Sequence, residues 1–421
     1  MSTIWGSRYA HRAQGVQAST IRELLKVSEK PDVISFGGGL PSPDVFPVQR
    51  FEEACRKVLQ EHGASALQYG ATEGHEPLRE MIASNMARYG ILAGVDNVLI
   101  TSGSQQALDL IGKLLVNTAD RVVVEAPTYL GALQAFSIYG AKFVPVSIDQ
   151  DGLRTGLLES SLRAGAKFMY VLPNFQNPAG VTLSEGRRHE VVLLADRYGI
   201  PIIEDDPYGQ LRYEGDHLPP LIVLDRENLR RKDASMGNVV YLSTFSKTLA
   251  PGIRLAWVVA PPEVVRKLAL LKQGVDLHTS SFIQYVAYEV TRDGFLDEHV
   301  KRIRAVYRER RDVMLDSLQE FFPPEAAWTH PQGGLFLWVT LPEGIDSHDL
   351  FQSALKQGVA FVPGDSFYAA NHHEGRRHMR LNFSKPAPEE IREGIRRLSI
   401  AVKQHLRISR ETAEAVPEIA G

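Results

Sequence analysis

The sequence predicts an α/β fold: a large domain built on a mostly parallel sheet with helices on both faces, followed by a smaller α+β domain. Between about residues 97 and 260, short runs that are apolar throughout alternate with longer segments of helical periodicity. Such runs are typical of parallel strands, because both of their faces are buried. After residue 295 the pattern changes to a long, charged amphipathic helix and then to shorter strands and helices.

The elements follow in order along the chain. The large domain is expected to contain strands at 97–103, 121–127, 141–148, 167–173, 200–206, 239–244 and 254–260. The helices between them are predicted at 105–116, 128–139 and 184–199, the last with Ser184 as its cap and Gly199 as its stop. The C-terminal part predicts strands at 333–341, 358–364 and 378–384, with helices at 346–357 and 387–406.

These patterns divide the chain into three parts. Residues 1–45 form an N-terminal arm, rich in glycine and proline near its end, that we expect to pack with the small domain. Residues 46–294 form the large domain and 295–421 the small one.

Composition restricts the possible partners and compartment. The 421 residues carry 47 basic and 50 acidic side chains, a net charge of −3, which does not favour a nucleic-acid partner. The single cysteine, Cys55, excludes an internal disulfide. We see neither an apolar run long enough to span a membrane nor a signal-peptide pattern, and therefore expect a cytoplasmic protein.

The segment STFSKTLAPGIRLAW, residues 243–257, carries the strongest chemical signal. Lys247 follows a buried strand, where partial desolvation favours the neutral amine that covalent catalysis needs. The hydroxyls of Thr244 and Ser246 and the guanidinium of Arg254 are donors suited to a phosphate group. A reactive lysine beside a phosphate site fits pyridoxal phosphate. Taken alone, the segment also fits a solvated turn.

Three further segments place polar residues at the ends of predicted strands. Ser104 and Gln105 begin a helix, where free N–H groups attract an anion. Asp205 ends a strand, and a carboxylate held against a pyridine nitrogen keeps that ring protonated. Tyr208 follows it, and Asn177 lies in a turn after another strand. Each segment by itself also fits a helix cap or an ordinary turn, but the carboxyl edge of a parallel sheet is where such folds bind ligands.

With QNPAG, EDDPYG and SKTLAPGIRLAW in this order, residues 15–405 resemble the fold-type I, class I/II pyridoxal-phosphate aminotransferases. Within that family the chain is similar to the branch of 2-aminoadipate and broad-specificity aminotransferases. The resemblance implies a sheet of the seven-stranded type, a pyridoxal phosphate cofactor and a homodimer.

The resemblance also implies a role for each matching residue. Lys247 corresponds to the lysine that forms a Schiff base with the cofactor and later acts as general base. Asp205 corresponds to the partner of the pyridine nitrogen, and Asn177 and Tyr208 to donors to the phenolic oxygen. Tyr129 corresponds to the aromatic residue that stacks on the ring face, and Tyr69 to a tyrosine that reaches the phosphate in the neighbouring subunit. The phosphate itself is contacted by the residues that match Ser104, Gln105, Thr244, Ser246 and Arg254.

Five residues are expected to bind substrate, and one of them is Asn177, which is also expected to contact the cofactor. Arg380 matches the arginine that grips the α-carboxylate, and Gly39 brings the backbone close to it. Ser19 and Arg22, in QASTIRELLK, resemble the mobile helix that contacts the substrate side chain; a solvated, capped helix is the alternative. We expect transfer of the amino group of 2-aminoadipate or glutamate to a 2-oxo acid such as 2-oxoglutarate by a ping-pong mechanism, with aromatic or branched donors also possible.

Other functions share parts of this pattern. The same fold with Lys247 also runs β-elimination or decarboxylation, and some transcription regulators use it as a non-catalytic effector module. His372, His373 and His378 lie in a segment without a metal-binding motif, so we expect a solvated loop and no metal. ITSGSQQA does not supply the GxGxxG of a nicotinamide dehydrogenase.

Overall fold

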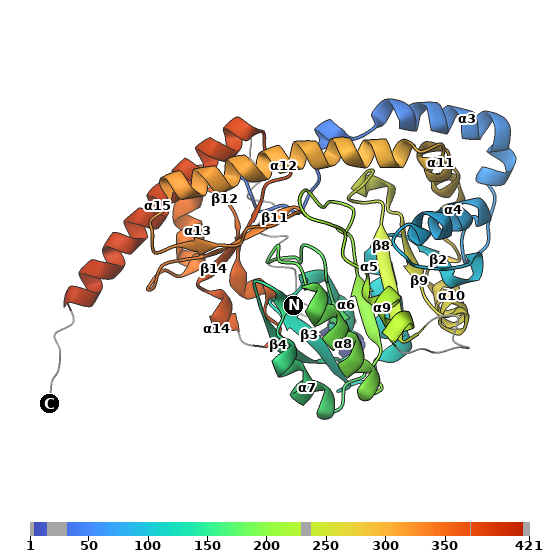
Figure 1. Ribbon diagram of the computed structural model, residues 1–421, viewed down its shortest axis with the longest axis horizontal. Coiled ribbons are helices and arrows are strands. Elements are labelled where there is room, and N and C mark those ends of the chain that lie inside the picture. Colours follow the sequence, from blue (N-terminus) through green and yellow to red (C-terminus); the bar gives the residue numbers. More distant parts are fainter. Residues whose placement is uncertain (1–3, 15–31, 229–236, 371, 416–421) are drawn as a thin grey trace.

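The computed structural model describes residues 4–14, 32–228, 237–370 and 372–415 (Figure 1). Its main sheet has eight strands in the order β2-β9-β8-β7-β6-β3-β4-β5, of which β5 is only Gly152–Leu153. The other strands are β2 (Val98–Thr101), β3 (Arg121–Ala126), β4 (Lys142–Asp149), β6 (Phe168–Val171), β7 (Ile202–Asp205), β8 (Val239–Thr244) and β9 (Ala256–Val259).

The predicted sheet is confirmed. Strands β8, β7, β6, β3 and β4 run parallel to one another, whereas β9 is antiparallel to both β2 and β8. The seven predicted strands are all present, and only the two-residue β5 was not expected. Such a short strand has too few residues to show an apolar pattern in the sequence.

Alternate residues of the strands build two cores, one on each face of the sheet. Val122, Val124 and Ile203 belong to a cluster with side chains of α5 (Ser104–Leu115), α6 (Leu130–Ser137) and α10 (Pro262–Asp276). Val123 and Ile202 point to the other face. The helices there are α3 (Val48–Ala66), α4 (Glu76–Ala87), α7 (Thr155–Arg163), α8 (Glu185–Arg197), α9 (Leu221–Asn228) and α11 (Ser281–Thr291).

The C-terminal part forms a third core around a four-stranded antiparallel sheet. Its strands, in sheet order, are β10 (Ala327–Trp328), β11 (Phe336–Thr340), β14 (His378–Asn382) and β13 (Val362–Pro363). The predicted strand 358–364 is two short strands, β12 (Val359–Ala360) and β13, because the chain changes sheet between them. Strand β12 pairs in parallel with β1 (Ile34–Ser35) in a separate two-stranded sheet, so this part of the N-terminal segment packs on the C-terminal core.

Two long helices cover this part of the molecule. Helix α12 (Phe295–Phe321) runs from α11 to α15 (Pro388–Ala415) (Figure 1), and its side chains join both the core around α11 and the C-terminal core. Helix α15 extends nine residues beyond the predicted end at 406. Helix α13 (Ser347–Lys356) matches the prediction closely. Over the residues that the structure describes, none of the helices combines the length and apolar character that a membrane span needs.

Candidate active site

The predicted site residues of the large domain lie where the parallel strands end. Asp205 is the last residue of β7, Thr244 is the last of β8, and Lys247 follows three residues later. Asn177 lies in the loop after β6, and Tyr129 precedes α6 after β3. Because parallel strands end at one edge of the sheet, the fold gathers residues that are far apart in the sequence.

Lys247 is partly buried and its Nζ donates a hydrogen bond to the Gly39 carbonyl oxygen at 3.0 Å. Burial, with the positive charges of Arg380 and Arg254, lowers the pKa of the Lys247 amine to about 8. Part of the amine is therefore neutral and nucleophilic near neutral pH. The carbonyl that accepts this hydrogen bond belongs to the N-terminal segment. A glycine suits position 39 because a Cβ there would lie 3.1 Å from the Phe336 ring.

Arg380 on β14 is buried and points at the same N-terminal segment. It donates hydrogen bonds to the Gly37 carbonyl oxygen at 2.7 Å and to Asn177 Oδ1 at 2.9 Å. Its guanidinium carbon lies 4.3 Å from the centroid of the Phe336 ring. Burial lowers the pKa of Arg380 to about 10, so it remains a cation at neutral pH. Within the described residues its Nε has no hydrogen-bond partner, which leaves a donor for a ligand.

Asp205 is 2% exposed, and burial raises the pKa of its carboxyl to about 7. Its Oδ2 accepts a hydrogen bond from the Tyr170 hydroxyl at 2.7 Å. Its Oδ1 is buried and has no partner among the described residues. A buried, unpaired carboxylate oxygen fits a protonated ring nitrogen, as pyridoxal phosphate would supply.

The residues predicted to bind the phosphate gather around the start of α5. The Ser104 hydroxyl is buried and unpartnered in the described structure, which fits an oxygen-rich ligand. Gly103 has φ 87°, and a Cβ there would collide with the Arg254 guanidinium, so only glycine lets that arginine approach. Helix α5 adds its free N–H groups.

Other members of this group are held by the protein itself. The Thr244 hydroxyl lies 3.0 Å from the Leu255 carbonyl oxygen and accepts a hydrogen bond from the Ser246 N–H at 3.0 Å. Its hydroxyl also lies 2.9 Å from that of Ser246, so it orients Ser246. The Gln105 side chain donates to the Gly131 carbonyl oxygen at 2.8 Å and ties α5 to α6.

Two of the aromatic residues lie within the same loop cluster. Tyr208 is buried beside Asn177, with which it shares a side-chain hydrogen bond, and burial raises the pKa of its phenol. The Lys247 Nζ lies 6.0 Å from the centre of the Tyr208 ring. The Tyr129 ring lies against Gly131, where a Cβ would overlap it. The structure thus brings Lys247, Arg380, Asn177 and Tyr208 together.

Three predicted residues are not gathered with this group in the described chain. Tyr69 is 80% exposed and faces His278 edge-on, with ring centroids 5.8 Å apart. Ser19 and Arg22 lie outside the described residues. Within the described ranges, no group of three or more His, Cys, Asp or Glu side chains could hold a metal ion. The predicted solvated loop is wrong for His378, which begins β14 and stacks half-buried on the Trp338 ring. The His372 side chain lies outside the described ones.

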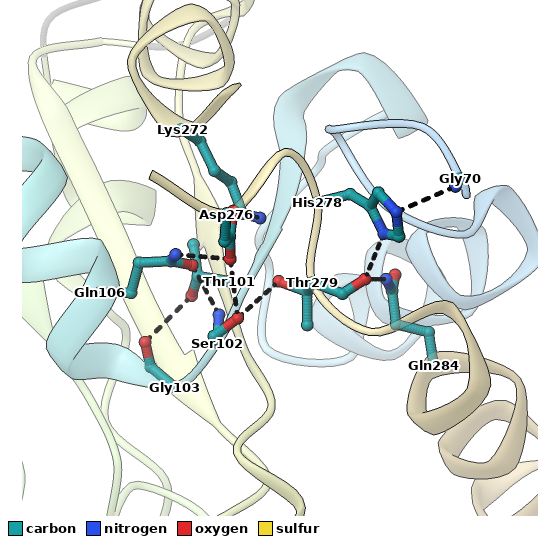
Figure 2. A network of polar contacts seen from close by, with 10 residues as sticks. All are labelled: Gly70, Thr101, Ser102, Gly103, Gln106, Lys272, Asp276, His278, Thr279 and Gln284. Carbon is teal, nitrogen blue, oxygen red and sulfur yellow. Dashed lines mark hydrogen bonds and ion pairs between the residues drawn. The ribbon is translucent and has the colours of Figure 1, made fainter. Parts of the chain in front are cut away.

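A polar network that the sequence analysis missed anchors the turn before α5 (Figure 2). Asp276 accepts hydrogen bonds from Ser102 at 3.0 Å and Gln106 at 2.6 Å, and it pairs with the buried Lys272 at 2.7 Å. From the same segment, His278 accepts a hydrogen bond from the Gly70 N–H at 3.2 Å. The network therefore joins the turn beside Ser104 to the loop that carries Tyr69.

Comparison with known proteins identifies the family. The family model described as aminotransferase class I and II matches residues 31–398. The chain belongs to the class I and II aminotransferases. An aromatic-amino-acid aminotransferase of Thermococcus litoralis is 47% identical over 406 residues, which cover 95% of each chain. The 2-aminoadipate transaminase of Thermus thermophilus is 42% identical over 400 residues, covering 95% of this chain and 97% of that protein.

A solved structure agrees with the sequence relatives. LysN, the α-aminoadipate aminotransferase of Thermus thermophilus, was crystallised with N-(5′-phosphopyridoxyl)-L-leucine. Its TM-score to this aminotransferase is 0.89, with 40% identity, 96% of this chain and 100% of that chain covered. This aminotransferase is accordingly a pyridoxal-phosphate-dependent enzyme of the fold that the sequence predicted. Relatives named as HTH-type transcriptional regulators also match 92–95% of this chain, at 26–32% identity. The two enzymes named above match it at 47% and 42% identity.

Proposed function

We propose that this aminotransferase moves the amino group of an acidic amino acid, 2-aminoadipate or glutamate, to 2-oxoglutarate, and that it also accepts aromatic donors. The observation that carries the proposal is the joint anchoring of Lys247 and Arg380. Their side chains donate to carbonyl oxygens only two residues apart, those of Gly39 and Gly37. A substrate amino group directed at the lysine therefore has its carboxylate near the arginine.

Pyridoxal phosphate, when bound, supplies the carbonyl that receives the amino group and the ring that delocalises the negative charge developing at the substrate Cα. Lys247 would hold the cofactor through its amine. Asp205 Oδ1 would hold the ring nitrogen, and Asn177 and Tyr208 the phenolic oxygen. The phosphate would be held by Ser104, Ser246, Arg254 and the first N–H groups of α5, with Gln105 and Thr244 supporting them, and Tyr129 would cover the ring.

The chain's own residues then divide the work on the substrate. Arg380 binds and orients the α-carboxylate, for which its planar guanidinium gives bidentate geometry. Lys247, whose lowered pKa of about 8 leaves part of its amine neutral, takes the proton from the substrate Cα as general base. Gly37 and Gly39 fix both cations through their carbonyl oxygens.

The choice of donor is supported by the relatives and by the N-terminal segment. The names of two relatives specify aromatic amino acids and 2-aminoadipate, so their chemistry includes both aromatic and acidic side chains. Arg22 would pair with a side-chain carboxylate, and Ser19 would add a hydrogen bond. An aromatic side chain, which offers no charge to Arg22, would be accepted at the same place without that pairing.

The first experiment follows the absorption of the purified protein loaded with pyridoxal phosphate. Adding 2-aminoadipate or glutamate should convert the bound cofactor to its aminated form, and 2-oxoglutarate should restore the original spectrum. Single-turnover rates for a panel of acidic, aromatic and branched donors then rank the substrates. Lys247→Ala should lose the conversion. A cofactor band that no acidic donor shifts would contradict the proposed substrate class.

The second experiment tests Arg22 directly. Arg22→Ala should lower kcat/KM for 2-aminoadipate and glutamate by about thirtyfold or more, because loss of one partner of a bound charge pair costs about 2 kcal/mol or more. Values for aromatic donors should change little. Arg12→Ala, at an exposed residue of the same N-terminal segment, is the control. Unchanged kinetics for every dicarboxylic donor would remove Arg22 from the substrate site.

A further inference from the structure

The two carboxylate oxygens of Asp205 have different surroundings. Oδ2 accepts a hydrogen bond of 2.7 Å from the hydroxyl of Tyr170, which is itself fully buried. Oδ1 is buried without a partner in the part of the chain that the structure describes. One oxygen is thus held by the protein, and the other is left for a ligand.

Strand register places Tyr170 for this contact. Tyr170 on β6 is paired with Ile203 on the adjacent β7, and Asp205 lies two residues further along β7, on the same face of the sheet. The Tyr170 ring packs at 5.9 Å from the Phe136 ring, within the core beneath α5, α6 and α10. The hydroxyl is therefore fixed by a packed strand and not by a flexible loop.

We propose that Tyr170 is a positioning residue that keeps Asp205 ionised and aims its free Oδ1 at the ring nitrogen of the cofactor. The inference rests on the proposed role of Asp205. A donor to the carboxylate stabilises its charged form, whereas burial and the neighbouring Asp206 both favour the neutral form. If the proton moved from the ring nitrogen to Asp205, the ring would delocalise negative charge less well.

A matched control lies on β8, the strand on the other side of β7. Tyr241 on β8 is also buried and donates a hydrogen bond to Asp206 Oδ2 at 3.0 Å. The other oxygen of Asp206 already accepts from the Gly209 N–H at 2.8 Å and from Asn174 at 3.0 Å. Asp206 therefore has no free oxygen for a ligand, although its tyrosine partner is equivalent to that of Asp205.

The test uses protein loaded with pyridoxal phosphate that carries ¹⁵N in its ring, because the ¹⁵N chemical shift reports whether that nitrogen is protonated. Tyr170→Phe should move the shift toward the neutral ring and lower kcat on the order of tenfold, with KM nearly unchanged, since a hydrogen bond to a charge is lost. Tyr241→Phe should keep the wild-type shift. A wild-type shift in Tyr170→Phe would overturn the inference.

The same measurement separates this inference from the proposed role of Asp205. If wild-type protein and Asp205→Asn give the same ¹⁵N shift, the assignment of Asp205 fails, whatever Tyr170 does. If only Asp205→Asn moves the shift, the role of Tyr170 alone fails. Should Tyr170→Phe not fold, tyrosine labelled with ¹³C at its hydroxyl-bearing carbon can be placed at position 170 in otherwise wild-type protein. Its signal should move when the cofactor binds, and an unmoved signal would contradict the inference.

Discussion

Lys247 and Arg380 are cations that the fold desolvates without giving them an anionic partner. Within the described part of the chain, both donate only to neutral groups: the carbonyl oxygens of Gly39 and Gly37 and the amide of Asn177. Uncompensated charge of this kind destabilises the protein alone and is offset when an anionic ligand binds. Burial of these two cations therefore lowers the stability of the ligand-free protein.

The effect of this buried charge on the free energy of unfolding can be measured at Lys247. Because folding lowers its pKa from 10.5 to about 8, the folded state binds this proton less tightly than the unfolded state, so stability rises as pH rises between those values. Lys247→Met should raise the free energy of unfolding of the cofactor-free protein by about 1–3 kcal/mol at pH 7. The gain should shrink above about pH 10.

Urea unfolding at the two pH values checks this prediction. Lys113→Met, at an exposed position on α5, is the control and should change stability by less than about 0.5 kcal/mol. A Lys247→Met protein no more stable than wild type at pH 7 would show that the lysine is not desolvated enough to matter.

At the scale of elements, a carboxyl one residue before the end of strand β3 ties together two loops of the candidate active site. Glu125 accepts hydrogen bonds from the Leu172 N–H at 3.1 Å and from Gln176 Nε2 at 3.3 Å. Gln176 also donates to the Pro127 carbonyl oxygen at 2.8 Å. The loops that carry Tyr129 and Asn177 are therefore joined at the end of β3.

Burial raises the pKa of Glu125 from 4.5 to about 8, so the folded state binds this proton more tightly than the unfolded state. The stability that this group contributes is present at low pH and is lost as pH rises through about 8. Glu125→Gln keeps an acceptor oxygen and removes the charge. We expect no change in stability at pH 4.5, and a gain of about 1–3 kcal/mol at pH 9.

Thermal unfolding of the cofactor-free variants over this pH range provides the measurement. Glu52→Gln, on the exposed side of α3, should leave the pH profile as in wild type. Parallel profiles for wild type and Glu125→Gln would mean that Glu125 does not titrate between these pH values in the folded protein.

At the scale of the whole molecule, the surface around Tyr69 bears on the predicted homodimer. Tyr69 is 80% exposed, and Leu67 at 71% and Leu277 at 60% are close to it in the two segments that His278 and Gly70 join. Exposed apolar side chains grouped in this way are typical of protein interfaces. The patch supports the proposal that Tyr69 completes the site of a second copy.

Subunit mixing tests that proposal. The Lys247→Ala homodimer should be nearly inactive. The Tyr69→Ala homodimer should also be nearly inactive or should bind the cofactor much more weakly. In a hybrid dimer, one site receives both defects and the other receives neither, so co-refolding the two variants should restore activity. Mixing Lys247→Ala with Asp205→Ala, both in the same chain's site, should restore none. Equal behaviour of the two mixtures would place Tyr69 outside the partner's site.

The sequence by itself determined the long strands of the main sheet and the residue types that indicate a pyridoxal phosphate site. Continuous apolar runs were enough for the seven long strands of the sheet, because burial on both faces depends on local composition. Lys247, Asp205 and Asn177 stand in short motifs whose residue types already indicate a pyridoxal phosphate site, and the family comparison agrees.

Only the tertiary structure decided how those residues are held. The partners of Asp205 and Glu125 lie 35 and 47 residues away, and Asp276 lies 174 residues from Ser102, so none of these contacts has a local signal. Tyr170 looks like an ordinary core residue of an apolar strand until strand register sets its hydroxyl beside Asp205. The sequence specifies which functional groups are present, whereas their hydrogen-bond partners depend on strand pairing and helix packing across the whole chain.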